Sequence, residues 1–319
     1  MQEQVNKPNH FGMNLAAVIS TMRLPFLILT PACLLLAFSL AYQKTGLVQW
    51  SLIGMISIGA ICAHIAVNML NEYSDFHSGL DFVTSRTPFS GGSGGLVAQP
   101  TAQRAVLVVA SINLLICCLL GLYMAFTIGR ELLSIGLIGV VIIVSYTRWI
   151  NRLPFLCLIS PGLAFGVLLV NGSYFVLTQS FDMEVFFVSL VPFFVVNNLL
   201  LLNQFPDIEA DKAHGRNHLL IKYGIDSGVR VYSVFALLSV LTLAMLIAFG
   251  KLPMLSAIGI LPLLMALVIG NELKRSNFKS SDTTDNQKLM SLMGKNVAVT
   301  ILTPTLLAVS IVLATHFGS

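Results

Sequence analysis

The feature that most constrains the fold of this chain is a series of nine apolar stretches. They lie at about residues 24–42, 48–70, 105–127, 132–149, 154–178, 185–203, 230–249, 252–271 and 297–315. A transmembrane helix needs about 20 apolar residues, and most of these stretches hold 18 or more with almost no charge. Only 10% of the whole chain is charged, against about 25% in a typical soluble domain. The sequence therefore predicts an all-α membrane protein with nine transmembrane helices, forming a single domain over residues 1–319.

The basic residues are distributed unevenly between the two sides of the membrane that nine spans would define. Fifteen of the 18 Lys and Arg residues fall at the N-terminus or in every second connection, and only Lys44, Arg130 and Lys251 fall on the other side. An excess of Lys and Arg marks the cytoplasmic side, so we expect a cytoplasmic N-terminus. The long polar segments lie on that same side, where we expect the functional residues; these segments are 68–104, 203–229 and 272–296.

Two of these segments begin with similar clusters of Asn and Asp. The first cluster provides Asn71, Asp75 and Asp81, and the second provides Asn203, Asp207 and Asp211. Residues four apart lie on one face of a helix, so we expect all three members of the second cluster to share a face. In the first cluster, Gly79 predicts that the helix ends or bends before Asp81.

The composition of both clusters favours a magnesium site. Carboxylates are costly at membrane depth unless they are paired, solvated or bound to metal. Amide and carboxylate oxygens are hard ligands that suit Mg²⁺, which commonly bridges protein carboxylates to substrate phosphates. Two such clusters facing each other would hold a diphosphate through metal ions. For either cluster alone, ordinary polar residues at a helix end are the alternative, but the duplication at equivalent helix ends argues against it.

Several polar and basic residues near the clusters are candidates for binding the diphosphate: Asn68, Arg86, Arg148, Lys212 and Arg216. A guanidinium can bind two phosphate oxygens at once. For Arg86 and Arg148, orientation of the chain by positive charge is the alternative explanation. The glycine-rich run at 90–95 is either a flexible loop or a source of backbone N–H groups for phosphate.

Other function classes find no support in the sequence. The basic residues are dispersed by topology rather than gathered into one stripe, so no nucleic-acid partner is expected. None of the five cysteines belongs to a C-x-x-C pair, which argues against a zinc or redox site.

Paired Asn- and Asp-rich segments after the second and sixth of nine helices resemble the UbiA superfamily of intramembrane prenyltransferases. The second segment, with Asn203, Asp207 and Asp211 at four-residue spacing and Gly215-Arg216 after them, is similar to that family's second motif. The longer spacing from Asp75 to Asp81 looks like the branch that prenylates 1,4-dihydroxy-2-naphthoate in menaquinone synthesis. Tyr146-Thr147 is also similar to a family pattern. The resemblance thus implies Tyr146 as a catalytic residue, together with Asp75 and Asp207.

The resemblance implies helices around a central apolar cavity and Mg²⁺-dependent transfer of a polyprenyl chain from its diphosphate to an aromatic acceptor. It also implies a location in the cytoplasmic membrane of a bacterium or archaeon, among membrane lipids. The sequence departs from the branch at 85–95 and 148–154, which leaves another quinone precursor, a tetrapyrrole or a glycerol-phosphate lipid open as acceptor. An ion-coupled transporter is the alternative from another class, but it would place its ionisable groups near mid-membrane.

Overall fold

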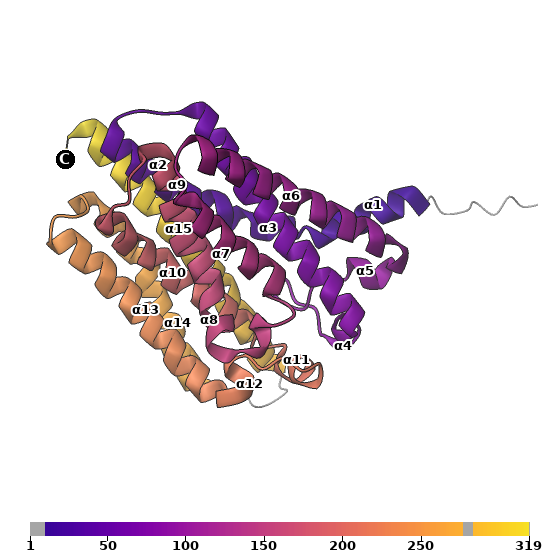
Figure 1. Cartoon of the computed structure of the whole chain (residues 1–319). Coiled ribbons are helices and arrows are strands. Elements are labelled where there is room, and N and C mark those ends of the chain that lie inside the picture. The colour runs from indigo at the N-terminus through magenta and orange to yellow at the C-terminus, as the bar shows by residue number, and fades with distance from the viewer. Residues whose placement is uncertain (1–9, 277–282, 319) are drawn as a thin grey trace, which may run out of the picture.

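The computed structural model describes residues 10–276 and 283–318, and within these ranges every regular element is helical (Figure 1). The α-helices are α1 (His10–Thr21), α2 (Leu29–Thr45), α3 (Trp50–Ser78), α4 (Leu80–Val83), α5 (Gly95–Ala98), α6 (Gln103–Thr127), α7 (Leu132–Ser145), α8 (Pro154–Gly162), α9 (Leu169–Thr178), α10 (Met183–Asn203), α11 (Ile208–Ala213), α12 (Leu219–Tyr223), α13 (Ile225–Ala248), α14 (Ile260–Arg275) and α15 (Thr283–Phe317). Five shorter helical segments join them: η1 (Leu24–Ile28), η2 (Pro100–Ala102), η3 (Ile150–Arg152), η4 (Leu163–Leu168) and η5 (Met254–Gly259). The predicted all-α class is confirmed.

Eight helical runs in the described ranges are long and apolar enough to cross a membrane. They are Asn14–Thr45, Trp50–Ser78, Pro100–Thr127, Pro154–Thr178, Met183–Asn203, Ile225–Ala248, Met254–Arg275 and Asn286–Phe317. The ninth predicted span, 132–149, is represented by α7, which is only 14 residues long. The helix ends at Ser145, and in the turn that follows, the Asn151 side chain donates a hydrogen bond to the backbone oxygen of Thr147. Such bonds compete with a helical backbone.

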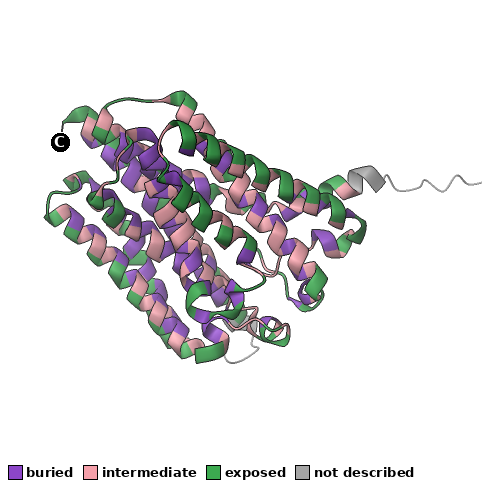
Figure 2. Ribbon diagram, in the orientation of Figure 1, coloured by how far each residue is buried: buried purple, intermediate pink, exposed green. Residues whose placement is uncertain are grey.

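The outward faces of the long helices are apolar, as expected for contact with lipid. Figure 2 shows exposed residues along the whole length of α6. They include Leu115, Leu119 and Phe126, whose exposed fractions are 56%, 57% and 69%. The inner faces pack into a continuous core to which α2, α10, α13 and α15 contribute. In water these exposed side chains would form an unfavourable apolar patch, whereas in a bilayer they face a matching solvent.

The run from α8 through η4 to α9 approaches α10 very closely. A Cβ atom on Gly166 would lie 2.5 Å from the backbone nitrogen of Phe193, so only glycine fits there. Pro161 and a π-helical turn, η4, interrupt the regular helix at this point. Pro removes a backbone N–H, and π-turns are frequent at functional sites. The irregularity places Pro161 and Phe165 on the wall of an internal cavity.

The short elements α4, α11 and α12 gather at one end of the bundle, the lower end in Figure 1. Gly79 has φ +84° and ends α3, so the predicted break before Asp81 is confirmed. The prediction of one helical face for Asn203, Asp207 and Asp211 is wrong. Helix α10 ends at Asn203, and α11 begins only at Ile208. Pro206 stands in the intervening turn, where a residue without a backbone N–H is tolerated.

The predicted cytoplasmic loop 272–296 differs in part. Helix α14 continues to Arg275, and α15 begins at Thr283, so much of this segment is helical. Residues 277–282 lie outside the described residues.

Candidate functional site

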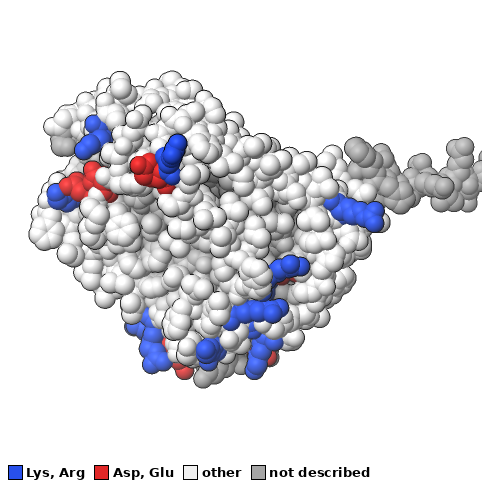
Figure 3. Space-filling model, viewed as in Figure 1, with Lys and Arg blue, Asp and Glu red and all other residues white. Residues whose placement is uncertain are grey.

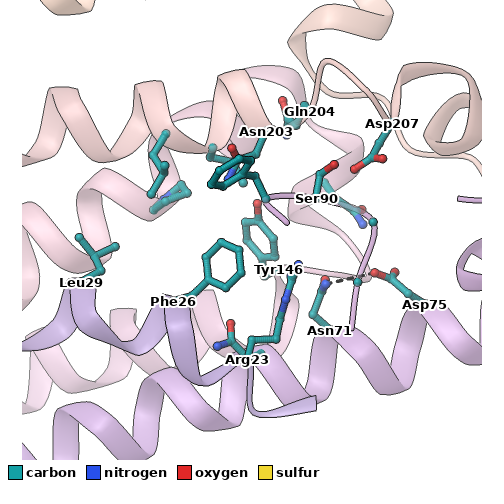
Figure 4. Close-up of a pocket in the computed structure, with 18 of the residues that line it drawn as sticks. Arg23, Phe26, Leu29, Asn71, Asp75, Ser90, Tyr146, Asn203, Gln204 and Asp207 are labelled. Carbon is teal, nitrogen blue, oxygen red and sulfur yellow. Dashed lines mark hydrogen bonds between the residues drawn. The ribbon is translucent and has the colours of Figure 1, made fainter. Parts of the chain in front are cut away.

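A cavity of about 300 Å³ brings the two Asn/Asp clusters together. All six predicted metal ligands line it: Asn71, Asp75, Asp81, Asn203, Asp207 and Asp211. An apolar part of the wall is formed by Phe26, Leu29, Pro161, Phe165, Val196 and Ile301. Figure 4 shows Asp75 and Asp207 on the side of the cavity away from Leu29. The cavity therefore has a charged end and an apolar end.

In the first cluster, hydrogen bonds fix the orientation of the amide. The Asn71 side chain donates from Nδ2 to Asp75 Oδ2 over 3.1 Å, as expected for residues on one helix face. Its Oδ1 accepts a bond of 3.0 Å from the hydroxyl of Thr147. Asn68 also lines the cavity, and it donates to the backbone oxygen of Met22. The end of α3 that carries Asn68 and Asn71 is thus attached both to the turn after α7 and to the chain ahead of η1.

Arg216 joins the two clusters. Its guanidinium forms ion pairs with Asp75 of α3 and, over 3.1 Å, with Asp211 of α11. Burial alone would lower the pKa of Arg216, but the two carboxylates outweigh it and raise that pKa. The sequence predicts that Arg216 binds diphosphate, and the structure places it in the cavity against carboxylates.

Three buried side-chain oxygens in the clusters have no hydrogen-bond partner among the described residues: Asp81 Oδ2, Asn203 Oδ1 and Asp207 Oδ1. Burial, followed by the charges of Glu72 and Asp75, raises the pKa of Asp81 to about 7. Burial, followed by the charge of Asp211, raises the pKa of Asp207 to about 7. A bound cation would both pair these oxygens and favour their charged forms.

This set of donors fits Mg²⁺ held jointly with a phosphate-bearing substrate. The free oxygens are hard ligands of the kind that Mg²⁺ prefers. Within the described ranges, no three His, Cys, Asp or Glu side chains stand close enough to hold an ion alone. Mg²⁺ characteristically keeps several waters and takes only one or two carboxylates besides substrate phosphates, so a complete protein cage is not required.

The glycine-rich segment at 90–95 lies against the first cluster through Glu72. The carboxylate of Glu72 is 1% exposed and accepts hydrogen bonds from the backbone N–H and the hydroxyl of Ser93, both of 2.7 Å. A Cβ on Gly92 would lie 2.9 Å from Asp81 Oδ1. The loop therefore contacts the candidate ligands closely, and Ser90 and Gly91 line the same cavity.

Sequence reasoning missed both Glu72 and Arg23. The Nε atom of Arg23 lies 3.6 Å from Glu72, and its guanidinium stacks 4.8 Å from the ring centre of Phe26 (Figure 4). Arg23 lines the cavity, although its position before an apolar stretch suggested only a topological role. The available signal for Glu72 was its place directly after Asn71 of the first cluster.

Three predicted diphosphate ligands do not line the cavity in this structure. Lys212 and Arg148 are exposed. Arg86 is also exposed, and it donates to the backbone oxygen of Asp81 over 2.7 Å. Their roles stay predictions. His64 lines the cavity and has its Nδ1 2.8 Å from the Thr30 hydroxyl.

Tyr146 lies on the cavity wall between the two clusters (Figure 4). Its hydroxyl is 4.0 Å from the Cys157 sulfur, which also accepts a hydrogen bond of 3.3 Å from Gln204. Asn151 and His218 continue this polar part of the wall. None of these four residues was predicted: Asn151, Cys157 and His218 belong to no motif, and Gln204 directly follows Asn203 of the second cluster but is not an acidic residue.

The fold and the cavity together define a polytopic membrane protein in which paired acidic clusters line one end of a cavity with a partly apolar wall. The chain belongs to the UbiA prenyltransferase family, whose sequence pattern matches residues 30–293.

Curated relatives support this assignment. The chain is 34% identical over 163 residues to 1,4-dihydroxy-2-naphthoate octaprenyltransferase of Bacillus subtilis, a match to 50% of this chain and 51% of that protein. It thus spans about half the length of this relative. The enzyme of the same name from Escherichia coli is 24% identical over 68% of this chain and 74% of its own. A 2-carboxy-1,4-naphthoquinone phytyltransferase of Synechocystis is 24% identical over 66% of each chain.

Solved structures show that the fold is shared. A digeranylgeranylglyceryl phosphate synthase superposes with a TM-score of 0.66 at 14% identity, covering 94% of this chain and 99% of the other. A UbiA homologue from Archaeoglobus fulgidus, bound to DMAPP and Mg²⁺, gives 0.65 at 12% identity over 93% and 99%.

Proposed function

We propose that this protein transfers a polyprenyl chain from its diphosphate to 1,4-dihydroxy-2-naphthoate in menaquinone synthesis, with Mg²⁺ as cofactor. The observation that carries the proposal is the single cavity with the two Asn/Asp clusters at one end and an apolar wall at the other. A polyprenyl diphosphate has the same division into a charged head and an apolar chain. Curated relatives named for this reaction support the choice of acceptor.

The chemistry assigns distinct tasks to the two ends of the cavity. Mg²⁺ at the clusters would stabilise negative charge on the departing diphosphate. Asp81, Asn203 and Asp207 provide the unpartnered oxygens for it, with Asn71, Asp75 and Asp211 beside them. The allylic C–O bond breaks, and its electron pair leaves with the diphosphate. The apolar wall, with Phe26 and Phe165, keeps water from the resulting allylic cation.

The new C–C bond forms between the allylic carbon and the ring carbon that carries the carboxylate. The carboxylate then leaves as CO₂, and the electrons of the broken C–C bond restore the aromatic ring. We assign Tyr146 to contact with substrate at this point, because it lies on the wall between the two clusters.

We also propose nine spans with a cytoplasmic N-terminus and a site that faces the cytoplasm, in the membrane of a bacterium or archaeon. In Figure 3, most of the Lys and Arg residues on the visible face lie at the end that carries α4, α11 and α12. The opposite end carries the ion pairs of Lys44 with Asp182 and of Lys251 with Glu184. The excess of positive charge at the site end supports this orientation.

The test is an assay of the full chain in lipid nanodiscs with radiolabelled geranylgeranyl diphosphate, Mg²⁺ and one acceptor at a time. The acceptors are 1,4-dihydroxy-2-naphthoate, 4-hydroxybenzoate and glycerol 1-phosphate. We expect prenylated naphthalenediol and one diphosphate per product with the naphthoate alone. Product only with another acceptor would overturn the choice of naphthoate. No prenylated product with any of the three would overturn the proposed transfer.

Variants in the second cluster refine this assay. We expect Asp207→Asn to lower turnover at least about 100-fold. Changing a residue that only supports a metal ligand typically lowers activity about 10–100-fold, and removing a ligand itself should cost more. Asp226→Asn is the matched control, since Asp226 is exposed and does not line the cavity. Equal rates for the two variants would contradict the metal site.

A further inference from the structure

Asn151 and His218 are buried polar residues that the proposed metal site does not use. Both line the cavity, with exposed fractions of 6% and 1%. Asn151 Oδ1 and His218 Nδ1 have no hydrogen-bond partner among the described residues. A buried polar atom left unpaired costs about 1–3 kcal/mol. Two such atoms on one cavity wall therefore indicate a ligand that supplies the missing bonds.

The two side chains come from segments far apart in the sequence, and the backbone holds them together. Asn217, which precedes His218, donates its N–H to the backbone oxygen of Asn151 over 3.0 Å. The Asn151 amide is itself oriented, because Nδ2 donates to the backbone oxygen of Thr147 over 2.5 Å. One of the two Nδ2 hydrogens is used in this bond, and the carbonyl oxygen is the side-chain atom of Asn151 that is left without a partner among the described residues.

The unpaired atoms select the chemistry of the ligand. The carbonyl oxygen of Asn151 needs a donor, which neither a carboxylate nor a fully ionised diphosphate can provide. Neither ring nitrogen of His218 has a hydrogen-bond partner among the described residues. Nε2 lies 3.2 Å from Asp211 Oδ2, and Nδ1 can donate or accept according to the protonation of the ring. A phenolic hydroxyl does both, so it can donate to Asn151 while it bonds to His218. Tyr146 lies on the same wall and offers a ring against which an aromatic molecule can pack.

We propose that Asn151 and His218 form a subsite that binds one hydroxyl group of the aromatic acceptor and so selects a hydroxylated ring. This inference rests on the proposed function, and it adds the residues that would recognise the acceptor. An amide oxygen can also coordinate Mg²⁺, which is the alternative partner for Asn151 Oδ1. However, the hydrogen-bond partners of Asn151 among the described residues are backbone atoms of Tyr146, Thr147 and Asn217 rather than carboxylates.

The test measures binding directly, so that it does not depend on turnover. Anaerobic calorimetry would give the Kd of 1,4-dihydroxy-2-naphthoate, 1-hydroxy-2-naphthoate and 4-hydroxy-2-naphthoate for the full chain in nanodiscs. We expect the wild type to bind one of the two monohydroxy compounds about tenfold more weakly than the dihydroxy compound. This corresponds to a difference of about 1.4 kcal/mol in binding free energy. Asn151→Leu should weaken binding of the dihydroxy compound about tenfold and abolish that preference.

Asn113→Leu is the matched control, since Asn113 also donates to the backbone oxygen four residues earlier, over 2.9 Å, but does not line the cavity. It should retain the wild-type preference. His218→Leu should reduce the same preference as Asn151→Leu, which gives a second measurement if one variant fails to fold. A full hydroxyl preference in either folded variant would overturn the subsite, as would a changed Mg²⁺ affinity in Asn151→Leu.

The outcomes also separate this subsite from the proposed function. If the wild type binds naphthoates with a preference that depends on Asn151 but transfers no prenyl group, the proposed function fails and the subsite stands. If transfer to the naphthoate proceeds and the preference survives in both variants, the proposed function stands and the subsite fails.

Discussion

Arg216 is the residue on which the two acidic segments converge. Its guanidinium supplies the positive charge between Asp75 and Asp211, and its side chain is only 20% exposed. Buried carboxylates without a compensating charge are strongly destabilising, so the guanidinium stabilises this arrangement. An ion that shared Asp75 and Asp211 would release guanidinium N–H groups toward a diphosphate. The residue thereby links the predicted metal ligands to the predicted diphosphate contact.

Asp81 and Asp207 predict a defined pH dependence, because both have a pKa raised to about 7. In the unfolded chain an Asp titrates near pH 3.9. Between about pH 4 and 7 the metal-free folded protein therefore holds more protons than the unfolded chain, and these two groups make its stability fall as pH rises across that interval. Mg²⁺ must displace the protons, so its affinity should rise from pH 6 to pH 8.

Thermal unfolding in EDTA or in Mg²⁺, at pH 6 and at pH 8, measures this linkage. We expect the increase in Tm caused by Mg²⁺ to be larger at pH 8. The double variant Asp81→Asn, Asp207→Asn is the control, because it removes both titrating groups and should remove the difference between the two pH values. An equal Mg²⁺ effect at both pH values in the wild type would contradict the prediction.

At the scale of elements, the glycine-rich segment at 90–95 is fitted to the first cluster. Gly92 has φ +73°, and a Cβ there would lie 2.9 Å from Asp81 Oδ1 and 3.4 Å from Glu72 Oε1. The left-handed conformation costs a non-glycine residue about 1–2 kcal/mol. Any side chain at this position would also displace a candidate metal ligand.

We therefore expect Gly92→Ala to lose at least about tenfold in kcat, since a shift of the order of 1 Å at a site can cost about 100-fold. Gly46→Ala is the matched control, because Gly46 has φ +66° but a Cβ there would meet nothing within 4 Å. It should show the backbone strain as a lowered Tm with normal kcat. Equal kcat for both variants would contradict the prediction, because it would show that Gly92→Ala strains the backbone without displacing Asp81.

Local sequence rules accounted for some elements and not for others. Gly79 correctly marked the end of α3, since a glycine in the left-handed region is a common helix end. The four-residue spacing of Asn203, Asp207 and Asp211 misled, because Pro206 allows a turn that the spacing alone does not reveal. That turn still leaves all three side chains on one cavity. The spacing predicted the proximity of these residues but not the backbone that produces it.

At the scale of the whole molecule, strong and repeated signals were the predictable ones. Long apolar runs fix the helical class, and two Asn/Asp clusters at equivalent helix ends predicted that both belong to one site. Asn151, His218 and Glu72 could not be predicted in the same way. Their contribution depends on tertiary contacts, such as the bond from Asn217 to Asn151 and those from Ser93 to Glu72.

The number of spans is the remaining question at this scale, and the sidedness of the two termini answers it. Within residues 10–276 and 283–318, eight helical runs meet the length expected of a span, and α7, with 14 residues, is the ninth candidate. An odd number places the termini on opposite sides of the membrane, whereas an even number places them on the same side. The charge distribution favours nine, with the N-terminus inside.

Reporter fusions in a bacterial host provide the measurement. We expect green fluorescent protein to fluoresce at the N-terminus and alkaline phosphatase to be active at the C-terminus. Fusions after Arg130 and after Arg152, on either side of α7, should give opposite sidedness, with phosphatase activity only at Arg130. A helix of 14 residues spans only about 21 Å, so α7 crosses only if the turn after it lies within the interfacial region. Identical sidedness at these two positions, with both termini inside, would establish eight spans and would place α7 on one side of the membrane.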